Sequence, residues 1–239
     1  MMTMHSTRVT NGISIEDPAA SPFRGVEISI VVPTLNEAEN IRVLYEAIRD
    51  CLTDVDWEMI VVDDDSTDGT VSVAREIAAT DRRIRCLRRI GRRGLSGAVV
   101  EGILSSSAFA VAVIDADMQH DERILRRMLF ELRNGADVAI GSRHTNGGTA
   151  SHGFSRWRQF ASNFATSLAQ RMLRVRVSDP MSGFFAIRRT VAESIVPSLS
   201  TQGFKVLLDL LVSAPEPLKV VELPYEFRPR HRGQHGGGQ

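Results

Sequence analysis

The feature that most restricts the fold of this 239-residue chain is an apolar run that ends abruptly in two carboxylates. Residues 110–114 read Ala-Val-Ala-Val-Ile, and Asp115 and Asp117 follow at once. Five small or β-branched residues in a row predict a strand buried on both faces, as in a parallel sheet covered by helices. Open sheets of this kind bind ligands at the carboxyl ends of their strands. The two acids therefore indicate a Mg²⁺ and phosphate site, with a simple polar turn as the alternative interpretation.

Predicted strands and helices alternate along the rest of the chain. Apolar runs predict strands over residues 26–33, 57–62, 84–87, 110–114, 137–142 and 219–226. Helical spacing of apolar residues predicts helices over 41–52, 71–78, 95–105, 124–132, 155–173, 190–196 and 204–212. Asn36 is the predicted cap of the first helix. This order predicts an α/β domain with a mostly parallel sheet, right-handed crossovers and helices on both faces.

Composition and missing motifs exclude several classes of protein. Lysine plus arginine equals aspartate plus glutamate at 29 each, which argues against a nucleic-acid binder driven by net positive charge. No Gly-x-Gly-x-x-Gly follows the first predicted strand, and no Gly-x-x-x-x-Gly-Lys-Ser/Thr occurs anywhere. A dinucleotide enzyme and a P-loop NTPase are therefore disfavoured. A phosphatase with an Asp-x-Asp nucleophile would carry that motif on its first strand, whereas here it follows the fourth.

The chain divides into a predicted disordered leader at 1–25, a folded domain at 26–227 and a flexible tail at 228–239. No apolar run reaches the roughly 18 residues of a membrane span. We therefore expect a cytoplasmic protein, soluble or peripheral at the membrane. Cys51 and Cys86 belong to no metal-spaced cluster, which predicts buried thiols of a reducing compartment.

Three predicted strands end in polar or acidic residues of the kind that bind ligands. These ends are residues 33–37 (Pro-Thr-Leu-Asn-Glu), residues 63–65 (three aspartates) and residues 115–117 (Asp-Ala-Asp). Neighbouring parallel strands place such ends at one edge of the sheet. An acid on an early strand can accept hydrogen bonds from a base or ribose, and a later pair can hold a metal on the diphosphate. Together they predict a site for a nucleotide diphosphate.

Six ordered motifs resemble the dolichol-phosphate mannosyltransferase group of glycosyltransferase family 2. They occupy residues 32–41, 61–70, 115–120, 141–143, 179–185 and 203–205. The resemblance covers about residues 27–233 and implies a GT-A fold, which is Rossmann-like. It also implies inverting transfer of a hexose, most often mannose from GDP-mannose, to a polyprenyl or dolichyl phosphate at the cytoplasmic face of the membrane. The implied partners are the nucleotide sugar, the lipid and a possible separate membrane-anchoring protein.

The resemblance also assigns residues to roles. It implies that the nucleoside is held by Pro33, Leu35, Glu37, Val62 and Asp64, where Leu35 stands at a position that is usually tyrosine. It implies that Asp115, Asp117 and Gln119 bind Mg²⁺ or Mn²⁺ and that Ala116 lines the same diphosphate site.

The acceptor explains why no general base is evident. A lipid phosphate is already an anionic nucleophile near neutral pH, so positioning and charge neutralisation can suffice. The resemblance implies that Arg143, Arg158 and Ser162 hold this phosphate, with Asp117, Arg143 and Arg158 as the catalytic residues. Guanidinium groups suit phosphate, although an exposed arginine on a helix is more often a solvent or salt-bridge residue. The seven arginines between residues 81 and 94 can likewise contact lipid or nucleotide, or form a solvated face.

The carboxyl-terminal tail departs from the family pattern. Arg230 is in place, but residues 234–239 (Gln-His-Gly-Gly-Gly-Gln) replace the usual Ser-Lys. We therefore expect reduced but not abolished chemistry. A family 2 enzyme with a hydroxyl acceptor and an impaired remnant that binds nucleotide sugar are alternatives, and a Mg²⁺ phosphohydrolase is a more distant one.

Overall fold

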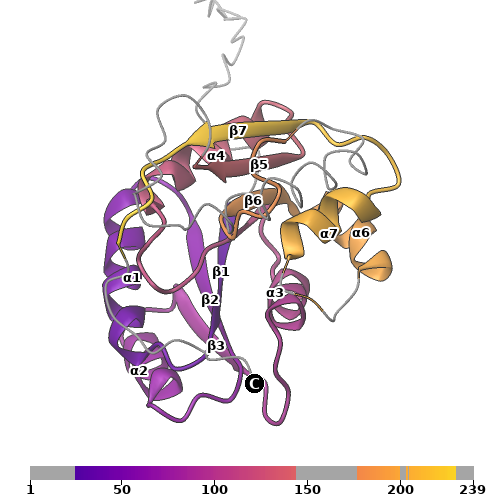
Figure 1. Cartoon of the computed structure of the whole chain (residues 1–239). Coiled ribbons are helices and arrows are strands. Elements are labelled where there is room, and N and C mark those ends of the chain that lie inside the picture. Colours follow the sequence, from indigo (N-terminus) through magenta and orange to yellow (C-terminus); the bar gives the residue numbers. More distant parts are fainter. Residues whose placement is uncertain (1–24, 144–176, 200–202, 204, 230–239) are drawn as a thin grey trace, which may run out of the picture.

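The computed structural model describes residues 25–143, 177–199, 203 and 205–229. The chain folds around a seven-stranded sheet with the order β3-β2-β1-β4-β6-β5-β7 (Figure 1). The strands are β1 (Ile28–Thr34), β2 (Trp57–Asp63), β3 (Ile84–Arg88), β4 (Ala110–Val113), β5 (Val138–Ser142), β6 (Phe185–Arg188) and β7 (Val220–Pro224). The helices are α1 (Ala38–Cys51), α2 (Thr70–Ala78), α3 (Leu95–Leu104), α4 (Leu125–Arg133), α6 (Arg189–Ile195) and α7 (Val206–Ser213), with short 3₁₀ turns at Glu122–Ile124 and Val196–Ser198. The predicted α/β domain with a mostly parallel sheet is confirmed.

Helices cover both faces of the sheet and make two separate apolar layers. In Figure 1, α1 and α2 lie to the left of the sheet, and α3, α6 and α7 lie to its right. Ile30 and Val32 of β1 pack into the layer that contains α1, α2 and α4, whereas Val31 packs against α3. Because successive side chains of a strand point to opposite faces, an apolar run such as β1 can supply both layers.

The sheet is parallel except at β6, a strand that the hydrophobic pattern does not predict. β1 pairs in parallel with β2 and β4, and β5 pairs in parallel with β7. β6 lies between β4 and β5 and is antiparallel to both. With four residues, it is too short for periodicity to distinguish it from a loop.

The antiparallel strand has a direct consequence for the site. Phe185, its first residue, pairs with Val113 at the carboxyl end of β4 and with Ile140 of β5. The segment before Phe185 therefore lies at the same edge as the carboxyl ends of β1, β2, β4 and β5. Through this strand, residues 179–184 come to lie beside the acidic loop after β4.

The loop after β1 corrects one sequence prediction. Asn36 does not cap α1: its φ of 59° is in the left-handed region, and Glu37 takes the capping position. The first backbone amides of α1 are instead satisfied from the next strand end. Asp68 accepts a hydrogen bond from Ala38 N at 2.9 Å, and Thr70 Oγ1 accepts one from Glu37 N at 2.9 Å. The cap was predicted wrongly because the groups that accept hydrogen bonds from these amides lie some 30 residues later in the chain.

Among the described residues, no helix is both long enough and apolar enough to cross a bilayer.

Candidate active site

Three neighbouring strand ends form the candidate site, and each is followed by a strained residue. Asn36 after β1, Asp65 after β2 and Met118 after β4 have φ values of 59°, 62° and 64°. These are the non-glycine residues with positive φ among the described residues. Left-handed backbone is unfavourable for side-chain-bearing residues and often occurs at functional sites. The three loops therefore hold tight shapes at one edge of the sheet.

The aspartates after β2 have different roles. Asp63 is fully buried and accepts hydrogen bonds from Ser66 N at 2.9 Å, Ser66 Oγ at 2.5 Å and Thr34 Oγ1 at 3.1 Å. Ser66 Oγ in turn accepts a hydrogen bond from Asn36 N at 2.8 Å. Asp63 thus ties the loops after β1 and β2 together and has a structural role.

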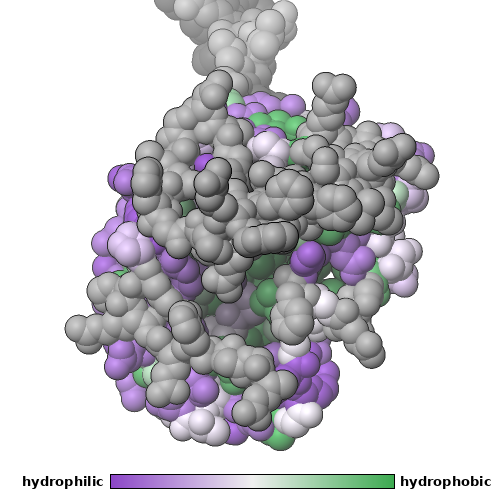
Figure 2. All heavy atoms as spheres, in the orientation of Figure 1, coloured by the Kyte–Doolittle hydropathy of each residue, from purple (hydrophilic) through white to green (hydrophobic). Residues whose placement is uncertain are grey.

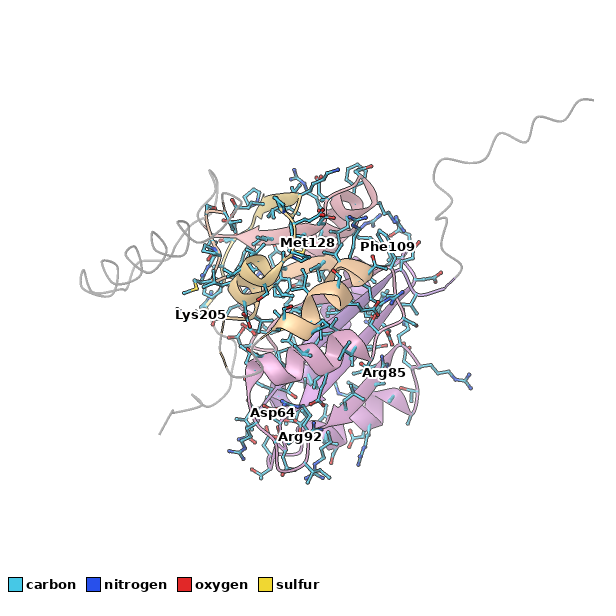
Figure 3. All side chains as sticks on the ribbon, turned by 90° about the vertical axis from the view of Figure 1, so that its right-hand side faces the viewer. Asp64, Arg85, Arg92, Phe109, Met128 and Lys205 are labelled. Carbon is cyan, nitrogen blue, oxygen red and sulfur yellow. The ribbon has the colours of Figure 1, made fainter. Side chains whose placement is uncertain are left out.

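Asp64, the predicted nucleoside ligand, is held by a buried arginine. Arg89 pairs with Asp64 Oδ1, and Gly94 N donates to Asp64 Oδ2 at 2.6 Å. The Arg89 side chain is only 6% exposed and also contacts Glu101 at 3.2 Å. Glu101 pairs with the exposed Arg92 at 2.7 Å, and Figure 3 shows Asp64 and Arg92 at the same end of the molecule. The Asp64 side chain is therefore held in one position beside the amino end of α3.

The other predicted nucleoside residues lie around the same edge. Pro33 and Glu37 are half-buried, and Leu35 is exposed. Val62 is fully buried beneath the edge, between β1 and β3. Their contacts with a nucleoside stay a prediction.

The predicted metal ligands all lie in the loop after β4. Asp115 keeps 42% of its side chain exposed, Asp117 Oδ1 accepts a hydrogen bond from Gln119 N at 3.1 Å, and Ala116 is buried. Gln119 Nε2 donates to the carbonyl oxygen of Arg228 at 3.3 Å, which leaves the Gln119 amide oxygen as its cation-binding atom.

This donor set fits a divalent cation that also binds substrate. Nowhere in the described residues do three or more His, Cys, Asp or Glu side chains gather as a complete metal site. Two carboxylates and one amide oxygen leave further coordination positions to be filled. Mg²⁺ typically uses one or two protein carboxylates together with substrate phosphates. The loop is therefore suited to a cation that arrives with a diphosphate.

Arg143 lies at the same edge, immediately after β5. Its Nε and Nη2 atoms donate to the two oxygens of Asp179 at 2.9 and 3.3 Å, and its guanidinium lies 5.2 Å from the centre of the Phe227 ring. Burial alone would lower the pKa of Arg143, but the hydrogen bonds to Asp179 raise it above its ordinary value. Asp179 is buried, and its backbone amide donates to Glu222 of β7 at 3.1 Å. Arg143 is thus a fixed, permanently charged group with three further N–H donors.

A pocket opens beside Asp115, between α3, the turn before β6 and the start of α7. Its walls are mostly apolar and include Leu95, Val113, Phe185 and Leu207, with Lys205 at its edge. Figure 2 shows apolar side chains recessed near the centre of the face drawn in Figure 1. Figure 3 places Lys205 on the side of the molecule that carries α7, away from Asp64. The pocket therefore lies directly beside the Asp115 carboxylate.

Several site residues were missed by the sequence analysis. Asp179 and Lys205 belong to quoted motifs but received no role, and Arg89 was counted only as part of a basic run. His120, the last residue of the acidic motif, contacts Asp115 and was also missed. Arg158, Ser162 and Arg230 lie outside the described residues, so their predicted roles stay predictions.

The basic run from residue 81 to 94 is largely neutralised inside the chain. Five of its seven arginines pair with acids: Arg83 with Asp81, Arg85 with Glu58, Arg88 with Asp65, Arg89 with Asp64 and Arg92 with Glu101. This pairing leaves less free positive charge for an anionic lipid surface.

The chain is similar to known proteins over most of its length. The profile of the family described as Glycosyl transferase family 2 matches residues 29–196. The dolichol-phosphate mannosyltransferase of Pyrococcus furiosus is 36% identical over 211 residues, which cover 87% of this chain and 58% of that protein. The chain thus spans little more than half of that relative's length. The polyprenol monophosphomannose synthase of Mycolicibacterium smegmatis is 33% identical, and the match covers 91% of this chain and 83% of that protein.

The fold has solved counterparts of the GT-A type. Glucosyl-3-phosphoglycerate synthase from Mycobacterium tuberculosis, crystallised with Mn²⁺, UDP-glucose and phosphoglyceric acid, superposes with a TM-score of 0.59 at 23% identity. The superposition covers 88% of this chain and 73% of the synthase. At this identity the similarity concerns the fold, and the predicted GT-A architecture is confirmed.

Proposed function

Because this chain belongs to glycosyltransferase family 2, we propose that it transfers a mannosyl group from a nucleotide diphosphate sugar to a polyprenyl phosphate. GDP-mannose is the proposed donor. The observation that carries the proposal is the placement of Arg143 at the same sheet edge as Asp115, Asp117 and Gln119. A site for a diphosphate and a fixed cation for a second phosphate are what such a reaction needs. The names of the mannosyltransferase and mannose synthase relatives support mannose and a lipid phosphate.

The residues divide between donor and acceptor. Asp64 and the loop after β1 would bind the nucleoside, and Asp115, Asp117 and Gln119 would hold Mg²⁺ or Mn²⁺. The cation would neutralise charge that develops on the leaving diphosphate.

The acceptor side requires no proton transfer. Arg143 would bind the lipid phosphate through the N–H groups that Asp179 does not use, together with Arg158, Ser162 and Arg230. A phosphate oxygen would form the new bond to the anomeric carbon as the bond to the diphosphate oxygen breaks. Attack from the opposite side inverts that carbon, and the nucleoside diphosphate leaves. An already anionic nucleophile explains why the described site residues include no obvious general base.

A lipid acceptor implies contact with the membrane surface. We propose that the chain works as a peripheral protein at the cytoplasmic face, with or without a separate anchoring partner. Flotation with vesicles that contain polyprenyl phosphate tests this part, and binding should exceed that to vesicles without the lipid.

Transfer assays test the proposed reaction. GDP-mannose, UDP-glucose and UDP-N-acetylglucosamine are supplied in turn with a short polyprenyl phosphate and Mg²⁺ or Mn²⁺. We expect product from GDP-mannose, loss of activity on EDTA treatment, and a fall in kcat of about 100-fold for Asp117→Ala. Undiminished activity of Asp117→Ala would contradict the metal role.

The acceptor assignment needs its own variants. Arg143→Ala and Arg158→Ala should each lower kcat/KM by about 100-fold, because each removes a charged contact to phosphate. Arg126→Ala is the control, since Arg126 pairs with Asp54 on the exposed surface of α4. Transfer to hydroxyl acceptors alone would favour a different family 2 reaction. Nucleotide binding without turnover on any acceptor would favour an impaired remnant, which the altered tail motivates.

A further inference from the structure

A buried histidine connects the predicted metal loop to the segment after β7. His120 is 5% exposed and lies five residues after Asp115. Its Nε2 atom lies 3.3 Å from Asp115 Oδ2, and its Nδ1 atom lies 2.7 Å from the Tyr225 hydroxyl. Rings surround it, with centroids 5.3 Å away for Phe184, 5.6 Å for Tyr225 and 5.6 Å for Phe227. Both nitrogen atoms of this histidine therefore have partners in an otherwise aromatic cage.

The two contacts define which nitrogen carries the proton. An ionised carboxylate only accepts hydrogen bonds, so Nε2 of His120 must donate to Asp115. In a neutral imidazole Nδ1 is then an acceptor, and the Tyr225 hydroxyl must donate to it. Burial raises the pKa of Tyr225, which keeps the phenol protonated and able to donate. The two hydrogen bonds therefore run in one direction: Tyr225 donates to His120, and His120 donates to Asp115.

The Asp115 carboxylate is also confined by the backbone before β6. A Cβ atom at Gly183 would lie 2.8 Å from Asp115 Oδ2, so any larger residue there would displace this oxygen from its present position. The oxygen that meets Gly183 is the one that accepts from His120. With Oδ2 held in this way, Oδ1 is the atom left for a cation. Hydrogen-bonded partners behind a metal ligand set its orientation, and their loss typically weakens metal affinity 10–100-fold.

The same segment is fastened to the metal loop elsewhere. Arg228 N donates to Gln119 O at 2.8 Å, and the Arg228 guanidinium pairs with Asp121 and Glu122 at 2.8 and 2.9 Å. Phe227 contacts both the His120 ring and the Arg143 guanidinium. The histidine thus contacts the carboxylate assigned to the donor and packs on Phe227, which also contacts the arginine assigned to the acceptor.

We propose that His120 is a positioning residue for the donor metal, which holds Asp115 in a single orientation through a hydrogen-bond chain from Tyr225. This proposal rests on the metal role of Asp115 in the proposed function. It adds that the affinity for the metal depends on Tyr225, which lies 110 residues after Asp115 in the sequence.

Three variants of the full chain test the proposal by Mn²⁺ binding, measured from the electron paramagnetic resonance signal of free Mn²⁺ with GDP or UDP present. Tyr225→Phe keeps the ring but removes the donor. His120→Asn places its amide near the former Nδ1 and cannot reach Asp115, whereas His120→Gln can place its amide near the former Nε2. We expect the Mn²⁺ dissociation constant to rise about tenfold in Tyr225→Phe and His120→Asn, and to stay within about threefold of the parent in His120→Gln.

The melting temperature without metal separates positioning from folding. If His120 had a purely structural role, the melting temperature would fall in both His120→Asn and His120→Gln. The Mn²⁺ affinity of the folded protein would then be the same in these two variants. Unchanged affinity in Tyr225→Phe would overturn the inference and leave the proposed function standing. A parent chain that binds no Mn²⁺ with either nucleotide would overturn both.

Discussion

At the residue scale, neighbouring acids with one chemistry have separate roles because their partners differ. Asp63 is buried under hydroxyl and amide donors, Asp64 meets a buried guanidinium, and Asp65 pairs with the half-exposed Arg88 at 2.6 Å. The sequence alone shows three equivalent carboxylates after a strand. Only the atoms around each carboxylate show that Asp63 holds two loops together and that Asp64 is a candidate ligand.

The pair of Asp64 and Arg89 should matter for stability as well as for the site. Arg89→Met leaves the Asp64 carboxylate buried without its cation, and we expect the free energy of unfolding to fall by about 3 kcal/mol. Arg92→Met is the matched control, because Arg92 shares Glu101 with Arg89 but keeps 60% of its side chain exposed. The free energy of unfolding of Arg92→Met should fall by less than about 1 kcal/mol. Urea denaturation measures both, and equal losses would contradict the burial argument.

The two thiols should be unreactive in the native protein. Burial raises the pKa of Cys51 to about 12 and that of Cys86 to about 11, so little thiolate is present at pH 8. We expect a disulfide reagent to modify the native chain at least about tenfold more slowly than the chain in urea. The thiolate that the reagent releases is measured by its absorbance at pH 8. Equal rates in the two states would show that these thiols are accessible.

At the scale of elements, α3 packs closely on β1 near the carboxyl end of the helix. A Cβ atom at Gly102 would lie 2.4 Å from Val31 Cγ1, within the fully buried layer between helix and strand. A helix usually disfavours glycine, so this position is explained by tertiary contact and not by propensity. The hydrophobic pattern predicts α3 but gives no sign of this approach.

Gly102→Ala tests that approach. The added methyl group improves helix propensity yet collides with Val31, and we expect a net loss of about 1–3 kcal/mol in the free energy of unfolding. Val31→Ala removes the colliding atoms, so the double variant should be more stable than the sum of the single effects predicts, by about 0.5 kcal/mol or more. Strict additivity in chemical denaturation would show that the two residues do not collide.

At the scale of the whole molecule, the sheet order collects groups that are distant in sequence. β1, β2 and β4 are neighbours, so their acidic ends meet, and the reversed β6 brings Asp179 and Gly183 to the same edge. The segment after β7 then closes over the loop after β4 through Tyr225 and Arg228. Asp64, Asp115 and Arg143 are thereby held at one edge of a single sheet.

A ligand bound at this edge should stabilise the folded chain as a whole. At about 100 times its dissociation constant, GDP with Mn²⁺ should add about 2.7 kcal/mol, which corresponds to a rise of roughly 5–10 °C in melting temperature. Asp115→Asn should reduce the rise that depends on Mn²⁺, since it weakens the predicted metal site. Differential scanning fluorimetry with GDP, UDP and EDTA controls measures these shifts. A rise that is equal with and without Mn²⁺ would speak against a shared metal and diphosphate site.

The sequence by itself determined the α/β class, the positions of most strands and helices, and the acidic character of three strand ends. These follow from local periodicity and from abrupt changes in polarity, which a single chain displays without its partners. The tertiary structure decided the antiparallel β6, the capping of α1 by Asp68, the pairing of Asp64 with Arg89 and the chain from Tyr225 to Asp115. Each of these depends on groups that only folding brings together, since a hydrogen bond or ion pair is fixed by distance in space and not by spacing along the chain.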